Sequence, residues 1–330
     1  MQNIILPPRL ERGDTIGIFN SSFPITSKAP DAANRAAEFL KTKGYIIKPG
    51  KLWGCIDSYR SAPAKERADE FNELLYDSSV KCIMASIGGF VTNSMLPYID
   101  YGHFMKNPKI VVGMSDITSL LMALYAKTGV TVYYGPNMVS YARLEPYSDI
   151  ALSTFENVVN QRFEYTYKMP DNYSDEVIDW NKDLNEEISI ENKMVTLSGG
   201  KAVGRLIGGN LNTLTSVWGS EYMPTINEGD VLFLENTEEW IGYVERYVSW
   251  LKLCGVFDRI GGLIIGKHRA FDEQGTGKKP YDILLEIIGK PSFPILADFD
   301  CGHTTPMLTM PIGIRAEIDA DKQSLKLIYN

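Results

Sequence analysis

Three side chains whose types could support nucleophilic catalysis each follow a predicted strand. Ser115 comes after a β-branched run, Glu235 ends an apolar run, and His303 lies shortly after a third run. A nucleophilic serine needs a base within hydrogen-bond reach, and that base needs an acidic group to orient it. The sequence therefore holds the residue types of a serine hydrolase, although their order along the chain does not establish a triad.

Ser115 lies where a strand turns sharply into a helix. The run 110–112 ends in Gly113-Met-Ser-Asp, and apolar residues then recur at helical spacing over 117–124. Such a turn presents its serine at the carboxyl edge of a sheet, next to the N–H groups of the first helical turn. The alternative is that Ser115 only caps the helix. The two interpretations are compatible, because the cap position lets Asp116 offer its N–H. The second glycine of a Gly-x-Ser-x-Gly elbow is absent.

The chain has three histidines from which a base could come. His103 lies in an aromatic-flanked loop. His268 stands between Lys267 and Arg269, which disfavour an imidazolium ion. His303 is flanked by small residues that let its ring approach another segment. If Ser115 is a nucleophile, His303 is the best base of the three; otherwise a structural histidine is the simpler interpretation.

Glu235 ends a strand whose four preceding residues are all apolar. A carboxylate at the end of a buried strand is costly unless it is paired or hydrogen-bonded. It could orient a histidine, or it could form a structural ion pair. Glu238 and Glu239 are close competitors, for which a solvated loop position is the usual interpretation.

An oxyanion hole requires backbone N–H groups that point at one place. The N–H of Asp116 at the helix start is one candidate. The stretch 86–89 is another, because Gly88 and Gly89 let the backbone approach a substrate closely. An ordinary strand-to-helix turn is the alternative for this stretch.

Composition excludes several classes of function. The net charge of −8 and pI of about 5.1 argue against a protein that binds the nucleic-acid backbone. Four separate cysteines without a CxxC pair suggest neither a zinc site nor a disulfide framework. We find no nucleotide phosphate loop, no H-E-x-x-H metal motif, no long apolar run and no secretory leader pattern. We therefore expect a cytoplasmic enzyme with reduced thiols, no metal, no cofactor and no membrane or nucleic-acid partner.

Strand and helix patterns alternate along the chain, which predicts an α/β protein with a mainly parallel sheet covered on both faces. The segment 165–193 is polar, lacks apolar periodicity and contains Trp180, so we interpret it as a linker and a functional loop. The predicted strands are 14–19, 45–48, 80–85, 109–112, 130–134, 201–207, 230–235, 261–265, 294–297, 311–318 and 324–328, and the predicted helices are 31–43, 63–76, 93–96, 117–124, 147–160, 244–253 and 281–288.

A series of short motifs in order resembles the LD-carboxypeptidase family of serine peptidases, and most closely its branch of microcin C immunity peptidases. Each motif alone is weak, but seven in order give a strong resemblance. They are Ser86-Ile-Gly-Gly, Val112-Gly-Met-Ser-Asp-Ile-Thr, Tyr134-Gly-Pro-Asn, Gly204-Arg-Leu-Ile-Gly-Gly-Asn-Leu-Asn-Thr, Leu232-Phe-Leu-Glu, Ile265-Gly-Lys-His and Asp298-Phe-Asp-Cys-Gly-His-Thr-Thr-Pro-Met-Leu-Thr-Met-Pro-Ile-Gly.

The resemblance implies a Ser–His–Glu triad of Ser115, His303 and Glu235, with an oxyanion hole formed by the N–H groups of Gly89 and Asp116. It implies a doubly wound flavodoxin- or Rossmann-like domain (1–164) that carries the serine. A C-terminal α/β domain of the swivelling β type (194–330) would carry the glutamate and histidine, with 165–193 as linker and substrate loop. It also implies a homodimer.

Two substrate classes compete within the family. The carboxypeptidases cut murein tetrapeptides and usually read Arg-Gly-Gly-Tyr-Gly after the third strand, where this chain has Ser86-Ile-Gly-Gly-Phe90 without the arginine that would meet a substrate carboxylate. The immunity-type peptidases cleave the amide or phosphoramide bond of aminoacyl- or peptidyl-nucleotides such as processed microcin C. They resemble this chain in the long loop with Trp180, where an aromatic ring can stack on a nucleobase, and in Trp218-Gly-Ser-Glu-Tyr-Met-Pro.

We therefore predict a peptidyl-nucleotide hydrolase, with Trp180, Asn210 and Gly88 as substrate-binding residues. An LD-carboxypeptidase acting on murein peptides is the alternative, and a non-catalytic α/β binding protein is the second. Glu238 and Glu239 are a departure that could change the substrate range if other members carry a basic residue there.

Overall fold

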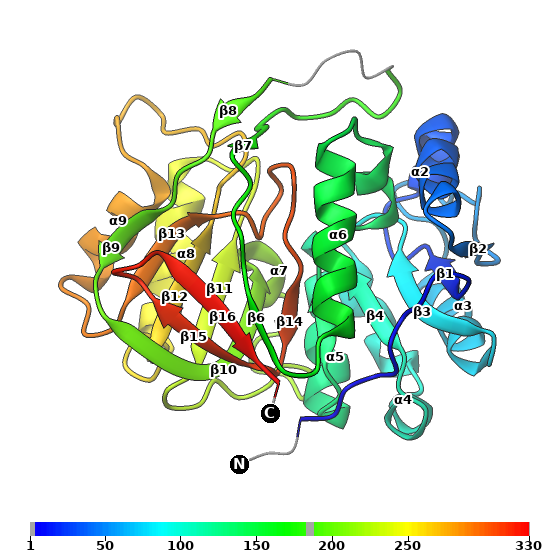
Figure 1. The fold of residues 1–330 in the computed structure, drawn as a ribbon, viewed down its shortest axis with the longest axis horizontal. Coiled ribbons are helices and arrows are strands. Elements are labelled where there is room, and N and C mark those ends of the chain that lie inside the picture. Colours follow the sequence, from blue (N-terminus) through cyan, green and yellow to red (C-terminus); the bar gives the residue numbers. More distant parts are fainter. Residues whose placement is uncertain (1–3, 183–187, 330) are drawn as a thin grey trace.

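The computed structural model describes residues 4–182 and 188–329. Two sheets lie side by side, one built mainly from the N-terminal half of the chain and the other from the C-terminal half (Figure 1). The predicted fold class, a mainly parallel α/β sheet joined to a second α/β unit, is confirmed. Part of the predicted substrate loop, residues 183–187, lies outside the described residues.

The first sheet has the strand order β14-β5-β4-β3-β1-β2. Its five strands from β1 to β5 are parallel and β14 is antiparallel to β5. The parallel order 2-1-3-4-5 is that of a flavodoxin-like doubly wound sheet, in which ligands bind beyond the carboxyl ends of the strands. The strands are β1 (Thr15–Phe19), β2 (Ile46–Pro49), β3 (Val80–Ala85), β4 (Ile110–Gly113), β5 (Val132–Tyr134) and β14 (Met310–Ile312).

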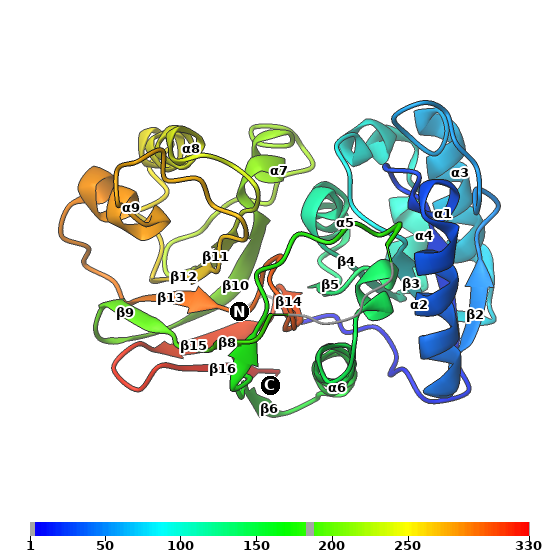
Figure 2. The ribbon, with the colours of Figure 1, turned by 90° about the horizontal axis from the view of Figure 1, so that it is seen from above.

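Helices cover both faces of this sheet, which explains why β1 and β4 are buried along their whole length (Figure 2). One group of helices comprises α2 (Pro30–Thr42), the 3-10 helix η3 (Met138–Ala142) and α6 (Tyr147–Asn160). The other comprises α3 (Ala64–Tyr76), η1 (Thr92–Tyr98), α4 (Tyr101–Lys106) and α5 (Thr118–Thr128). Two short helices, α1 (Ile25–Lys28) and η2 (Ser115–Ile117), follow β1 and β4.

Helix α5 is apolar on nearly every side, because it lies between the two sheets. It contacts β4 and β5 of the first sheet, and β10 (Lys201–Asn210) and α7 (Leu211–Thr215) of the second half. The helix that begins directly behind Ser115 is therefore packed from both halves of the molecule.

The second sheet has the order β6-β16-β15-β10-β11-β12-β13-β9, with the run from β10 to β13 parallel and the other pairs antiparallel. Helices α8 (Ile241–Leu253) and α9 (Pro280–Ile288) pack together on one face (Figure 2). The strands are β6 (Glu164–Thr166), β9 (Val195–Ser198), β10 (Lys201–Asn210), β11 (Val231–Glu235), β12 (Gly262–Gly266), β13 (Ile295–Phe299), β15 (Arg315–Asp319) and β16 (Ser324–Ile328).

The chain returns to the first sheet near its end. The predicted single strand 311–318 is wrong: it is two strands, because the chain turns at Gly313 with a φ of 97°. The first piece, β14, pairs with β5, and the second, β15, pairs with β10. The C-terminal half thus contributes one strand, β14, to the first sheet, in addition to packing against it.

The described parts of the segment 165–193 contain more secondary structure than its polar composition suggests. It begins within β6, which pairs with β16, and it carries the short strands β7 (Asn172–Tyr173) and β8 (Ile190–Glu191), which pair with each other. The division into domains at 164 and 194 stays a prediction. Among the described residues, no helix is long and apolar enough to cross a membrane.

Candidate active site

Ser115 occupies a strained turn between β4 and α5. Its φ of 62° lies in the left-handed region, which a residue with a side chain adopts at a cost of about 1–3 kcal/mol. The Ser115 N–H donates a hydrogen bond of 3.0 Å to the hydroxyl oxygen of Tyr134 at the end of β5. The packing of α5 against both halves of the molecule and this hydrogen bond hold the turn in place.

Two glycines leave room in front of this turn. A Cβ on Gly88 would lie 2.9 Å from the Ser115 Cβ and 3.3 Å from the Asp116 nitrogen, so any side chain there would press on the serine. Gly89 has a φ of 147°, and a Cβ on it would lie 2.4 Å from the Ser22 Oγ. Both positions require glycine for steric reasons.

The Asp116 carboxylate braces the loop that carries these glycines. Its Oδ2 accepts hydrogen bonds from the Thr92 N–H (2.9 Å) and hydroxyl (2.7 Å). Burial raises the pKa of Asp116, and the hydrogen bonds from Thr92 and Ser22 oppose this rise. The Ser22 Oγ in turn accepts from the N–H groups of Phe90 and Val91. The loop after β3 is therefore tied to the turn after β4.

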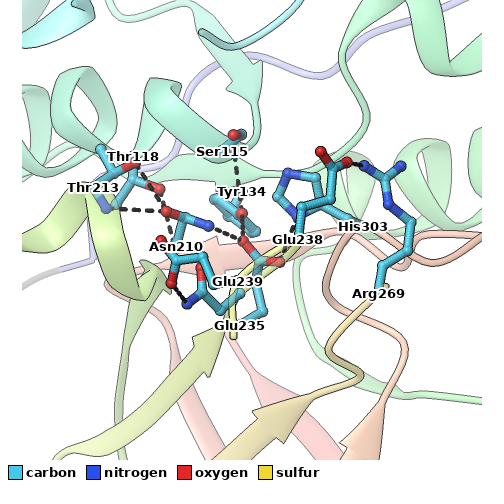
Figure 3. Close-up of polar contacts among 11 residues, drawn as sticks. Ser115, Thr118, Tyr134, Asn210, Thr213, Glu235, Glu238, Glu239, Arg269 and His303 are labelled. Carbon is cyan, nitrogen blue, oxygen red and sulfur yellow. Dashed lines mark hydrogen bonds and ion pairs between the residues drawn. The ribbon is translucent and has the colours of Figure 1, made fainter. Parts of the chain in front are cut away.

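Glu235 at the end of β11 is buried, and it pairs with the partly exposed His303 in the loop after β13. The His303 Nδ1 lies 2.7 Å from the Glu235 Oε2. The other carboxylate oxygen accepts hydrogen bonds from the Tyr134 hydroxyl (2.5 Å) and the Asn210 amide (2.9 Å), as Figure 3 shows. Burial acts to raise the pKa of Glu235, but the charge and hydrogen bonds of these partners outweigh it and hold this pKa below its ordinary value.

Asn210 lies at the end of β10, inside this network. Its amide donates to Glu235, and its Oδ1 accepts from the N–H and hydroxyl of Thr213 as the cap of α7. The residue is 4% exposed and is not among the described residues that line the pocket. These contacts position the carboxylate, and the predicted contact of Asn210 with substrate stays a prediction.

The loop that carries His303 is fixed on two sides. Thr305 exchanges two backbone hydrogen bonds with Ser174 of the segment 165–193 (2.7 and 3.0 Å). Asp300 forms a buried ion pair with Lys267 (2.6 Å) and accepts from the Asn192 amide (2.6 Å). The linker segment therefore helps to place the histidine.

One cavity of about 430 Å³ joins these parts. Ser115 and His303 both line it, together with Gly88, Gly89 and Trp180. Its charged lining residues are Arg143, Arg269 and Glu238, and the last two form an ion pair with each other (Figure 3). The predicted nucleophile, base and aromatic residue thus share one pocket, although their roles stay predictions.

The structure places the other two histidines apart from this role. Burial lowers the pKa of His268 to about 4, and the neighbouring charge of His303 acts in the same direction. His103 lies in α4, against the ring of Tyr76. Within 4–182 and 188–329, no group of three or more His, Cys, Asp or Glu residues could hold a metal ion.

Sequence reasoning gave no role to Tyr134. It ends an apolar strand and is fully buried, so its pattern is that of a core residue. The available signal was that a buried tyrosine hydroxyl usually finds a hydrogen-bond partner. Tyr133 is also a buried tyrosine and gives the same signal. Only the second sheet, which brings Glu235 to the Tyr134 hydroxyl, distinguishes the two residues.

A serine on a strained strand-to-helix turn, sharing a pocket with a histidine that is paired to a buried carboxylate, is the arrangement of a serine hydrolase. Comparison with protein families agrees with this class. Residues 16–135 match the model of the LD-carboxypeptidase N-terminal domain, and residues 203–318 match that of the C-terminal domain. The chain belongs to the LD-carboxypeptidase family and is a serine peptidase.

Relatives with described activities cover nearly the whole chain. The microcin C7 self-immunity protein MccF of Escherichia coli is 44% identical over 328 residues, which span 98% of this chain and 95% of that protein. A probable murein peptide carboxypeptidase of Bacillus subtilis is 29% identical over 96% of this chain and 92% of its own length.

Solved structures agree in fold. The MccF structure without ligand superposes with a TM-score of 0.96 at 45% identity, with 99% of each chain covered. MccF in complex with aspartyl sulfamoyl adenosine also gives a TM-score of 0.96, at 44% identity and the same coverage.

Proposed function

We propose that this serine peptidase hydrolyses the amide or phosphoramide bond that joins an aminoacyl or peptidyl group to a nucleotide, as in processed microcin C. One observation carries the proposal: Ser115, His303 and Trp180 line a single pocket. The complex of MccF with an aminoacyl sulfamoyl nucleotide supports it, because that ligand combines the same two chemical groups.

Ser115 acts as the nucleophile in this proposal. Its Oγ attacks the carbonyl carbon, and the His303 Nε2 takes the hydroxyl proton, since the Nδ1–H is held by Glu235. The N–H groups of Gly89 and Asp116 stabilise the oxyanion of the tetrahedral intermediate. The intermediate collapses as the C–N bond breaks, and His303 delivers its proton to the leaving nitrogen. Water then hydrolyses the acyl-enzyme with His303 as base.

Trp180 supplies the nucleobase contact. Its indole lines the same pocket as Ser115 and belongs to the segment whose Ser174 pairs with the His303 loop. A nucleobase stacked on an indole gains about 1–3 kcal/mol, largely without regard to which base it is. Gly88 leaves the space beside the serine into which the scissile group fits.

Hydrolysis of murein peptides is the second candidate. The observation in its favour is that Arg143 and Arg269 line the pocket, since arginine recognises a carboxylate well. Arg269, however, is already paired with Glu238, which lines the same pocket. We therefore favour the nucleotide substrate.

Side-by-side hydrolysis of a peptidyl-sulfamoyl adenosine and a murein tetrapeptide tests this choice. We expect the nucleotide compound to be cleaved with the higher kcat/KM, and the opposite preference would reverse the assignment. Ser115→Ala should lower kcat by about 10,000-fold or more. An unchanged rate in that variant would refute the mechanism. If the unaltered protein cleaved neither compound, a non-catalytic binding protein would be favoured instead. We also propose, from the family resemblance, that the protein works in the cytoplasm as a homodimer.

A further inference from the structure

Tyr134 connects the two halves of the site. It is the last residue of β5, where it lies in register with Gly113 of β4 and Met310 of β14. Its ring is fully buried and packs against Phe233 of β11, with ring centroids 5.6 Å apart. The side chain thus crosses from the first sheet to the second, directly below Ser115 in Figure 3.

The direction of its two hydrogen bonds is fixed by chemistry. The Ser115 N–H can only donate, so the Tyr134 oxygen accepts at 3.0 Å. The single hydroxyl proton is then left for the Glu235 Oε1 at 2.5 Å, where an ionised carboxylate can only accept. Burial raises the pKa of Tyr134 well above its ordinary value, so the hydroxyl keeps the proton that both contacts require.

This pair of bonds has a consequence for the nucleophile. Ser115 adopts a φ of 62°, and its N–H is engaged below the turn. The Ser115 N–H is therefore directed at Tyr134 and does not serve the oxyanion. The same hydroxyl fixes Oε1 of Glu235, while Oε2 holds the His303 Nδ1. The Tyr134 hydroxyl oxygen thus fixes both the backbone of the nucleophile and the carboxylate that orients the base.

We propose that Tyr134 is a positioning residue, whose hydroxyl group links the Ser115 backbone to the Glu235 carboxylate. Through these two hydrogen bonds it fixes the position of the nucleophile in one half relative to the Glu235–His303 pair in the other. This inference rests on the proposed function for the roles of these three residues. It adds a residue that touches no substrate and acts only through Ser115 and Glu235.

The neighbouring tyrosine provides a matched control. Tyr133 is also fully buried in β5, but its hydroxyl has no hydrogen-bond partner among the described residues. Tyr133→Phe and Tyr134→Phe therefore remove the same atom from adjacent buried rings, and only the second removes hydrogen bonds. Thermal unfolding of both variants checks that each one folds.

Steady-state kinetics gives the first readout. We expect Tyr134→Phe to lower kcat by about 10- to 100-fold with little change in KM, because a hydrogen bond to a charged group and one to the turn are lost. Tyr133→Phe should stay within about 2-fold of the unaltered protein, since it removes an unpartnered hydroxyl. Equal kcat values in the two variants would overturn the proposal.

The pKa of the Glu235 carboxyl group gives a second readout, which needs no substrate. The hydrogen bond from the Tyr134 hydroxyl lowers this pKa, so the pKa of Glu235 should rise in Tyr134→Phe and not in Tyr133→Phe. Infrared difference spectra over a series of pH values follow the carboxyl band, and a Glu235→Gln variant assigns it. An unchanged Glu235 pKa overturns the positioning role, even where Ser115→Ala is inactive. A raised pKa together with full activity of Ser115→Ala overturns the proposed function and leaves the Tyr134 hydrogen bonds a structural contact.

Discussion

The two sheets contribute to the site in different ways. The first sheet supplies backbone: positive φ angles at Ser115 and Gly89, and the N–H of Asp116 at the start of a helix. The second sheet supplies charge, in the form of a buried carboxylate and the imidazole hydrogen-bonded to it. Backbone geometry is sensitive to an added atom, whereas a buried charge is sensitive to replacement by a neutral group of the same shape. Adding a methyl group to a glycine therefore tests the contribution of the first sheet, and neutralising a carboxylate tests that of the second.

A neutral replacement of Glu235 should have the largest effect in this comparison. Glu235→Gln keeps the shape but removes the charge that stabilises the protonated His303 and fixes its tautomer, so kcat should fall about 1,000- to 10,000-fold. The measurement is the steady-state rate with the nucleotide substrate, together with the melting temperature.

Glu239→Gln is the matched control for that change. Glu239 is a neighbouring, half-buried carboxylate that accepts hydrogen bonds from Asn212 and Tyr247. It does not contact His303 in the described structure, so its neutral variant should keep kcat within about 10-fold. A larger loss from Glu239→Gln than from Glu235→Gln would show that the acid has been assigned to the wrong carboxylate.

An added methyl group on the first sheet should have the next largest effect. The Cβ in Gly89→Ala would meet the Ser22 Oγ at 2.4 Å and displace the loop that carries the proposed oxyanion N–H, so kcat should fall about 100- to 1,000-fold. Gly13→Ala is the control, because Gly13 also has a positive φ (97°) but open space around its Cβ. It should cost about 1 kcal/mol of stability and leave kcat unchanged. Equal kcat losses would mean that strain alone, and not the displaced N–H, explains the result.

The sequence predicts the candidate residues within each half better than it predicts the contacts between the halves. Ser115, Glu235 and His303 were candidates because each follows a predicted strand, and the family resemblance favoured a catalytic triad over a helix cap, an ion pair and a structural histidine. The Gly88–Gly89 pair stood out for a similar reason. These are local patterns, and they give both the fold class and the residues that share the pocket.

The connections between the halves could not be predicted in this way. Tyr134 acts through a contact across the sheet interface, and nothing local in an apolar strand tells which buried hydroxyl meets a carboxylate. Asn210 meets Glu235 because β10 and β11 are neighbours in the second sheet, which is also a long-range pairing. The same limit applies to β14, which local pattern joined to β15 but which pairs with β5 in the other sheet. Pairing between distant segments depends on the assembled fold and not on periodicity.

Trp180 belongs to neither sheet, and its substitution should have the smallest effect. It lies on the segment between the halves and lines the pocket without contacting the Glu235–His303 pair in the described structure. Trp180→Ala should therefore raise KM for a peptidyl-nucleotide about 10-fold through lost stacking and leave kcat nearly unchanged. Trp180→Phe, which keeps an aromatic face, should recover most of the affinity. If Trp180→Ala lowers kcat instead, or weakens a murein peptide equally, the indole supports the His303 loop and does not bind a nucleobase.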